Sequence, residues 1–236
     1  MKNRYHMARL LVGFIAAFNA PSSALAAVSY LVDDGTITHS VGVGAPGGDL
    51  IALNRFTTQV GGEDITNIQI NWTGIANGTN ATLVIYDDPN DDGNPNDLVL
   101  LNQVNVTTSG GGGFNNSFTD HLFPNTSVTG EFYVGALVSG MAATDFPFGY
   151  DATNPDFPGV SFFFENTTAG DLDVSNPNGT STLSGFSENF ITSGNFMIRA
   201  TGIEGALLPE PSSALLLLLS GIFWIGSRRR HFDFGK

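Results

Sequence analysis

The chain has 236 residues and a formal net charge of −13, with 9 Lys and Arg against 22 Asp and Glu. It contains no cysteine, which excludes disulfide scaffolds, zinc–thiolate sites and thiol enzymes. Residues 27–207 hold 20 of the acidic residues, and their only basic residues are Arg55 and Arg199. A surface of this charge repels nucleic acid and anionic lipid, whereas it favours solubility and divalent cations.

Residues 1–26 have the organisation of a secretory signal peptide. A short apolar core at residues 10–18 follows a basic start made of Lys2, Arg4 and Arg9. Ala24 and Ala26 then form the small-x-small pattern of a cleavage site, so Ala27 is the expected mature N-terminus. A retained anchor is the alternative, but this core is too short to span a bilayer, which needs about 20 residues. We therefore expect export through the secretion translocon.

Residues 27–202 predict one all-β domain. Short apolar runs alternate with turn clusters of Gly, Asn, Asp and Pro, and no run has a helical period. In residues 67–72 apolar and polar side chains alternate, which should place Ile68, Ile70 and Trp72 on the core face. Further strands are expected at residues 27–31, 50–60, 82–86, 98–106, 114–123, 132–138, 160–165 and 196–201.

Two of these runs, residues 82–86 and 132–138, are apolar on both faces and are expected to be central strands. Residues 145–158 and 170–185 are expected to form long irregular loops. A count of about eight or nine strands in about 180 residues favours a single β-sandwich or jelly roll.

The densest polar stretch is residues 87–97, DDPNDDGNPND. Oxygen side chains at its alternate positions, followed by Gly93, match the first half of a calcium loop. An EF-hand is excluded because Val99 stands where the bidentate Glu belongs and no helix flanks the loop. Asp97 is the expected substitute for that Glu. The predicted metal ligands are therefore Asp88, Asn90, Asp92, Asn94 and Asp97.

A solvated acidic turn is the alternative interpretation of this loop, because Asp, Asn, Gly and Pro are ordinary turn residues. Four aspartates lie within residues 87–92, however, and their mutual repulsion favours a nearby cation. We expect Ca²⁺ to bind with a Kd of about 10⁻⁴–10⁻³ M and to make one loop rigid, a structural rather than catalytic role.

Residues 145–158 gather aromatic and polar side chains of the kind that contact sugars. The expected glycan-binding residues are Phe148, Tyr150, Asp151 and Asn154. The alternative is that the phenylalanines are buried under the loop, as phenylalanine usually is.

Catalysis has little support in the sequence. His39 and His121 lack metal-ligand spacing, and no G-x-S-x-G motif occurs. Glu131, Glu165 and Glu188 are the candidates for a glycosidase carboxylate pair. We expect a protein that is not an enzyme, with a polysaccharide-acting hydrolase as the third hypothesis.

The C-terminal tail combines three parts in a fixed order. A rigid break that excludes helix comes first and consists of Pro209, Glu210 and Pro211. An apolar run at residues 214–225 follows, and the tail then ends in Arg228, Arg229 and Arg230. An apolar helix followed by arginines is typical of a membrane segment whose cationic end stays in the cytoplasm. Residues 203–208 form the expected tether to the domain, and residues 231–236 form a cytoplasmic overhang.

A plain C-terminal anchor and a buried core helix are the alternatives for this tail. The apolar run is short for a span, since residues 211–227 only reach the lower limit of about 17 residues. A core helix, by contrast, would not end in three adjacent arginines.

The order of Pro-Glu-Pro, apolar helix and arginine cluster in residues 209–230 resembles the PEP-CTERM sorting signal of Gram-negative bacteria. The resemblance implies that an exosortase recognises and processes the tail. It also implies that the protein is held in the inner membrane with its domain in the periplasm and then moves to the cell surface or extracellular matrix. Proteins with this signal are associated with exopolysaccharide and biofilm.

The interior is similar to β-sandwich domains of secreted bacterial surface proteins of unknown function. The likeness rests on residues 81–101, ATLVIYDDPNDDGNPNDLVLL, and residues 128–139, VTGEFYVGALVS. The leading hypothesis is therefore a non-catalytic surface or matrix protein, and a carbohydrate-binding module is the alternative.

Overall fold

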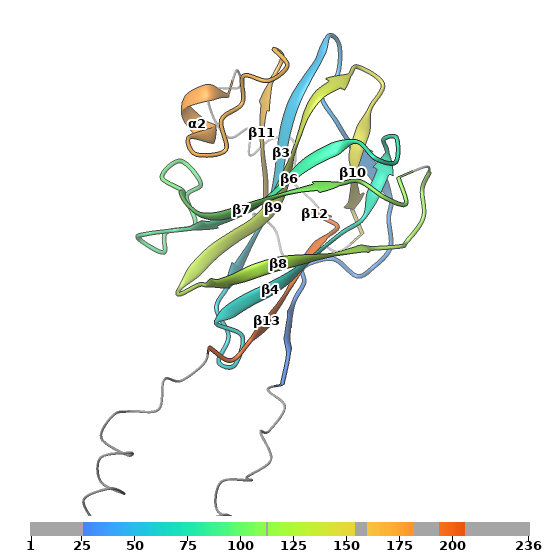
Figure 1. The fold of residues 1–236 in the computed structure, drawn as a ribbon. Helices are drawn as coiled ribbons and strands as arrows, with labels where there is room; N and C mark the ends of the chain where they lie inside the picture. The colour runs from blue at the N-terminus through green and yellow to red at the C-terminus, as the bar shows by residue number, and fades with distance from the viewer. Residues whose placement is uncertain (1–25, 112, 154–159, 182–193, 206–236) are drawn as a thin grey trace, which may run out of the picture.

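The computed structural model describes residues 26–111, 113–153, 160–181 and 194–205. These residues are nearly all β, as the sequence predicts, with thirteen strands and one short helix, α2 (Pro177–Thr180) (Figure 1). Within them, no helix has the length and apolar character needed to cross a membrane. The predicted sorting signal and residues 1–25 of the predicted signal peptide lie outside the described residues.

The strands form three antiparallel sheets. Sheet A has the order β1 (Val28–Tyr30), β13 (Ile198–Ile203), β4 (Asp64–Ile70) and β8 (Thr119–Ser127). In sheet B, β10 (Phe146–Asp151) pairs with β12 (Asn195–Phe196), β2 (His39–Val41) and β5 (Trp72–Gly74). Sheet C has the order β11 (Ser161–Asn166), β3 (Gly47–Thr57), β9 (Glu131–Ala142), β6 (Asn80–Asp87) and β7 (Val99–Thr107).

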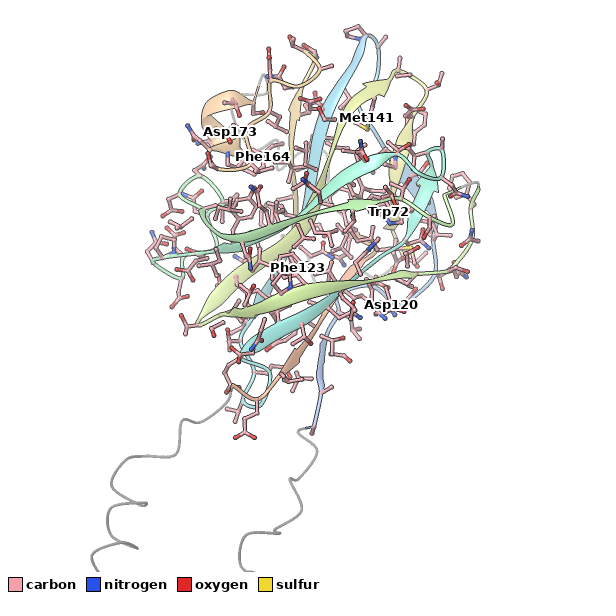
Figure 2. All side chains as sticks on the ribbon, viewed as in Figure 1. Trp72, Asp120, Phe123, Met141, Phe164 and Asp173 are labelled. Carbon is pink, nitrogen blue, oxygen red and sulfur yellow. The ribbon has the colours of Figure 1, made fainter. Side chains whose placement is uncertain are left out.

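The main hydrophobic core joins one face of sheet C to sheets A and B. Alternation along β4 and β5 works as predicted, because Ile68, Ile70 and Trp72 are all buried in this core. Aromatic rings fill its width: the Tyr30 ring packs edge-on against Phe132 with centroids 5.2 Å apart. Trp72 and Phe123 lie in the interior of the molecule in Figure 2.

A second, smaller core covers the outer face of sheet C. It explains why β6 and β9 are apolar on both faces, and both are central strands as predicted. Tyr86 and Tyr133 pack there with Phe162, Phe164 and Leu172. The Tyr86 hydroxyl donates a 2.7 Å hydrogen bond to the carbonyl of Val174, which fixes the segment before α2 onto the sheet. Phe164 lies on the α2 side of the molecule in Figure 2.

The strand count is higher than the eight or nine that the sequence predicts, and two differences account for part of the excess. Residues 146–151 form β10 instead of an irregular loop. The predicted strand at residues 67–72 is interrupted at Asn71, whose N–H donates to the Met197 carbonyl at 3.0 Å while its carbonyl accepts from Gly149. These strands are short and depend on partners distant in sequence, so local alternation does not indicate them.

A buried amide ties the sheets together. The side-chain nitrogen of Asn54 in β3 donates to the carbonyls of Phe196 and Ile198, both at 2.8 Å. Asn54 has no exposed surface, and its side-chain oxygen accepts a 2.5 Å bond from Ser161. Hydrogen bonds between satisfied polar groups in the core thereby join sheet C to β12 and β13.

Candidate functional site

The acidic stretch predicted to bind metal forms the loop between β6 and β7, beside the start of β9. Asp88 donates its N–H to the Glu131 carbonyl at 3.1 Å. The Asp91 carboxylate accepts the Glu131 N–H at 2.6 Å, and Asp91 adopts a positive φ of 55°. The loop is therefore fastened to the first residue of a central strand at two points.

Three of the five predicted ligands come together in this loop. Asp88, Asp92 and Asp97 each place a carboxylate oxygen within 4.8 Å of the other two. No other group of three acidic or histidine side chains with this spacing occurs in the described parts of the chain. Asp92 and Asp97 are exposed, whereas Asp88 is only 2% exposed.

The buried carboxylate of Asp88 is only partly satisfied. Its Oδ2 accepts a 2.8 Å hydrogen bond from the N–H of Gly93, which has a left-handed φ of 72°. Its Oδ1 is buried and has no hydrogen-bond partner among the described residues. Crowding of negative charge also reaches the preceding residue: burial raises the pKa of Asp87, and the charges of Asp91 and Asp88 raise it further.

The two predicted asparagine ligands serve the loop itself. The Asn90 side-chain oxygen accepts the Asp92 N–H at 3.3 Å. The Asn94 side-chain oxygen accepts both the N–H and the side-chain amide of Asn96, at 3.1 and 2.6 Å. Both side-chain oxygens thus accept turn hydrogen bonds, and the Asn90 side-chain nitrogen donates a 3.2 Å bond to the Asp92 carboxylate.

Arg55 lies next to the acidic loop, and no pattern in the sequence links this arginine to the loop. Arg55 in β3 pairs with Glu131, with 3.5 Å between Nη1 and Oε2. A Cβ on Gly93 would lie 1.4 Å from Nη1 of Arg55, so only glycine allows this approach. Arg55 in β3 and Glu131 in β9 are each 38 residues from Gly93 in the sequence. The order β3-β9-β6 in sheet C brings them to the loop, and no local sequence pattern indicates this.

The residues predicted to bind glycan do not form an exposed aromatic surface in the described part of the chain. Phe148 has no exposed surface and packs between Trp72 and Phe196, with centroids 5.5 and 6.1 Å away. Asp151 is fully buried and accepts hydrogen bonds from Asp34 and Thr153. Tyr150 is half-buried, and burial raises its pKa to about 12, with Asp151 adding to the shift. Asn154 lies outside the described residues.

The candidate glycosidase carboxylates lie apart. Glu131 pairs with Thr57 in β3 and Glu165 pairs with Leu50, so seven residues of one strand separate them. At about 3.4 Å per residue this is about 24 Å, well beyond the roughly 5–10 Å of a glycosidase pair. Burial raises the pKa of Glu165. The third candidate, Glu188, lies outside the described residues.

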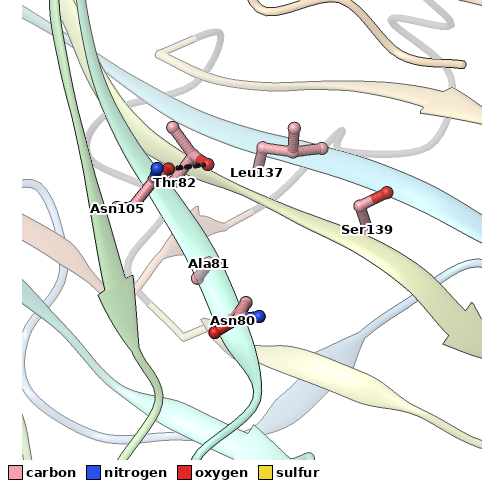
Figure 3. Close-up of a pocket in the computed structure, with 6 residues that line it drawn as sticks. All are labelled: Asn80, Ala81, Thr82, Asn105, Leu137 and Ser139. Carbon is pink, nitrogen blue, oxygen red and sulfur yellow. Dashed lines mark hydrogen bonds between the residues drawn. The ribbon is translucent and has the colours of Figure 1, made fainter. Parts of the chain in front are cut away.

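A depression of about 490 Å³ lies over β6, β7 and β9 (Figure 3). Four of its six lining residues carry an amide or a hydroxyl, and Thr82 donates a 2.9 Å hydrogen bond to Asn105 across neighbouring strands. The lining residues are Asn80, Ala81, Thr82, Asn105, Leu137 and Ser139. This surface is not predicted above, although the exposed positions of β7 are polar at Gln103 and Asn105.

Comparison of the sequence with models of protein families gives no match, and comparison with curated proteins gives none either. Solved structures do resemble the fold. A clostridial cysteine protease, Cwp84 after propeptide cleavage, is similar with a TM-score of 0.50 and 14% sequence identity over 76% of this chain and 40% of that chain. A structure of the cysteine protease and lectin-like domains of Cwp84, a surface layer associated protein of Clostridium difficile, has a TM-score of 0.43 and 13% identity over 76% of this chain and 36% of that chain.

The chain thus spans about two fifths of the length of these proteins. At this identity the likeness concerns the fold alone. The present chain contains no cysteine, so it has no thiol nucleophile of its own.

Proposed function

We propose that the chain is a preprotein whose exported part, residues 27–202, is one acidic β-sandwich domain that acts as a non-catalytic protein of the cell surface or extracellular matrix. In this proposal the PEP-CTERM-like tail is recognised at Pro209, Glu210 and Pro211 by an exosortase-type enzyme. The tail helix holds the protein in the inner membrane until processing, and exopolysaccharide is the expected neighbour at the surface.

The observation that carries the proposal is the pairing of the first strand with the last. Val28 in β1 pairs with Gly202 in β13, so the chain enters and leaves the domain at adjoining points of sheet A. Both predicted signals are therefore attached to the domain at neighbouring residues of sheet A. The charge supports the same role, because 20 acidic and 2 basic residues in residues 27–207 favour a soluble domain that does not bind nucleic acid.

The proposal is tested by the mass and location of the mature protein in its own host. A variant with alanine at Pro209, Glu210 and Pro211 should accumulate uncut in the inner membrane, whereas the native chain loses its tail and leaves that membrane. Alanine at the adjacent Ser212 and Ser213 is the matched control and should behave like the native chain. If native and variant chains stay in the membrane at the same mass, the tail is an ordinary anchor and the sorting proposal fails.

Carbohydrate binding is the second candidate function, and the depression on sheet C is the observation that favours it. Its amides and hydroxyls are suited to hydrogen bonds with sugar hydroxyls, although no aromatic ring lines it. The test is affinity electrophoresis of the full chain through gels that contain the host's exopolysaccharide. Alanine at Thr82 and Asn105 should abolish any retardation, whereas alanine at the exposed Gln103 of the same strand should leave it unchanged.

A further inference from the structure

We propose that Asp88, Asp92 and Asp97 bind one calcium ion in the β6–β7 loop, with Asp88 as the buried ligand. This site does not depend on the surface function proposed above or on the fate of the tail. The decisive observation is the Oδ1 atom of Asp88, which is buried and without a hydrogen-bond partner among the described residues. A carboxylate oxygen is unfavourable in such a place unless a cation neutralises it.

The spacing of the three carboxylates fits a single ion. Calcium–oxygen distances are about 2.3–2.6 Å, so two oxygens on one ion lie about 3.4 Å apart at a right angle and about 5 Å apart when opposite. The oxygens of Asp88, Asp92 and Asp97 lie within 4.8 Å of one another. The separations of the three oxygens therefore fall within the span that one calcium ion can bridge.

The donor set favours calcium among the common cations. The three converging side chains all offer carboxylate oxygens, and hard cations prefer oxygen ligands. Asp92 and Asp97 are exposed, so water can fill the remaining positions of an irregular coordination shell. Magnesium requires a near-octahedral arrangement at about 2.0–2.1 Å, which an open loop held at one buried residue does not impose.

The proposed set differs from the pattern read from the sequence. Counting Asp88 as the first position, the ligands stand at positions 1, 5 and 10, because Asn90 and Asn94 use their side-chain oxygens for loop N–H groups. The two asparagines shape the loop, and Asp97 closes it. Binding should therefore depend on Asp97 more than on Asn90.

Arg55 is the competing source of positive charge. Its guanidinium lies against Gly93, whose N–H donates to Asp88, yet the ion pair it makes is with Glu131. If Arg55 turned toward Asp88 it would neutralise the loop without a metal. If calcium neutralises the loop, the native chain binds calcium. If Arg55 neutralises it, the native chain does not respond to calcium.

The test uses the full chain, freed of metal with EDTA and titrated with calcium chloride in a calorimeter. We expect a Kd of about 10⁻⁴–10⁻³ M for the native chain. Asp88→Asn and Asp97→Asn should each weaken binding at least about tenfold, because each removes a charged ligand. Asn90→Ala should change it less than Asp97→Asn. Asp171→Asn, an equal charge change at an exposed residue outside the loop, is the control and should bind like the native chain.

Thermal unfolding supplies a second readout that a merely structural role would not produce. With excess calcium the native chain should be more stable than Asp88→Asn. In EDTA, Asp88→Asn should be at least as stable as the native chain. The asparagine removes the unpaired charge and keeps an acceptor for the Gly93 N–H. A structural Asp88 predicts that Asp88→Asn is less stable in both conditions.

Three results would overturn the proposal. In the first, the native chain shows neither binding heat nor a thermal shift at millimolar calcium, and only Arg55→Met responds to calcium. Arg55 would then neutralise the loop in place of the metal. The second is an Asp88→Asn variant that binds as tightly as Asp171→Asn. The third is a larger loss in Asn90→Ala than in Asp97→Asn, which would replace the proposed ligand set.

Discussion

The indole Nε1–H of Trp72 donates a 3.1 Å hydrogen bond to Nε2 of His121 in the interior of the protein. An indole nitrogen can only donate, so this bond requires a neutral His121 with its proton on Nδ1. Burial lowers the pKa of His121, and the neighbouring Asp120 offsets part of that effect. The bond connects β5 of sheet B to β8 of sheet A.

Acid should therefore weaken the fold through His121. The folded-state pKa is below the ordinary value of 6.5, so the unfolded chain takes up the proton first. This contribution to stability is complete above pH 6.5 and is lost as the pH falls through 6.5 toward the lower folded value. Thermal unfolding between about pH 7.5 and about pH 5 measures the loss. His121→Gln keeps an acceptor but does not titrate, so its stability should depend less on pH. Equal pH dependence in both proteins would assign the loss to other groups.

Removal of Asp49 should be among the most destabilising single changes outside the hydrophobic residues. This buried carboxylate accepts from the Ser139 hydroxyl at 2.5 Å and from the N–H groups of Gly140, Gly170 and Leu172 at 2.8, 2.7 and 3.1 Å. Asp49→Ala should lower the free energy of unfolding by about 3 kcal/mol or more, because four donors lose a fully buried acceptor and the N–H of Leu172 is itself buried. Urea denaturation measures this change. Asp49→Asn keeps one acceptor and should recover part of the loss, whereas a loss below about 1 kcal/mol for alanine would contradict the assigned role.

The pKa of Asp49 gives the same residue a separate signature in strong acid. Burial raises its pKa, but the four hydrogen bonds together outweigh burial and lower the pKa below 3.8. Its contribution to stability is thus present above the unfolded value and is lost as the pH falls below 3.8.

Arg199 forms an ion pair with the buried carboxylate of Asp33. The Arg199 Nε lies 3.2 and 3.0 Å from the two carboxylate oxygens, and the Asp33 side chain has no exposed surface. The guanidinium also stacks on Phe118, 4.0 Å from the ring centroid. Arg199→Met leaves a buried carboxylate unpaired and should cost about 3–5 kcal/mol.

A double-mutant cycle isolates the pair from the packing of the arginine. Asp33→Asn combined with Arg199→Met should be less destabilising than the sum of the single changes, because no charge is left unpaired. Additive losses in denaturant unfolding would show that packing on Phe118, and not the ion pair, carries the effect.

The parts of the fold that depend on local alternation could be predicted from the sequence. Ile68, Ile70 and Trp72 needed only the period of a strand to be placed in the core. Strands β6 and β9 are apolar on both faces, so a layer had to cover each side of the sheet. The main core covers one side and the second core covers the other. Strand β8 was displaced toward the C-terminus relative to the expected residues 114–123, and it carries Pro124, which an edge strand of sheet A tolerates.

The rest depends on contacts between distant segments. Strand β10 contains Pro147 and Gly149, which locally indicate a loop, and its pairing comes from three strands that are each only two or three residues long. At the loop, the spacing of the aspartates predicts a cation, but it does not indicate that Asp88 is buried by the docking of the loop on Glu131. Likewise, nothing near Asp49 in the sequence indicates the N–H groups of residues 170–172 that it accepts from.

The position of β13 sets the order in which the domain can be assembled. This last strand lies between β1 and β4, so until residue 203 is available β1 lacks its neighbour in sheet A and that sheet consists of β4 and β8 alone. Because the chain is synthesised from its N-terminus, β1 is made long before its partner β13, and strand edges of sheet A stay unpaired in between. Sheet A can therefore be completed only when the last strand has been made, and any chain cut short before Ile198 should remain a substrate for chaperones and proteases.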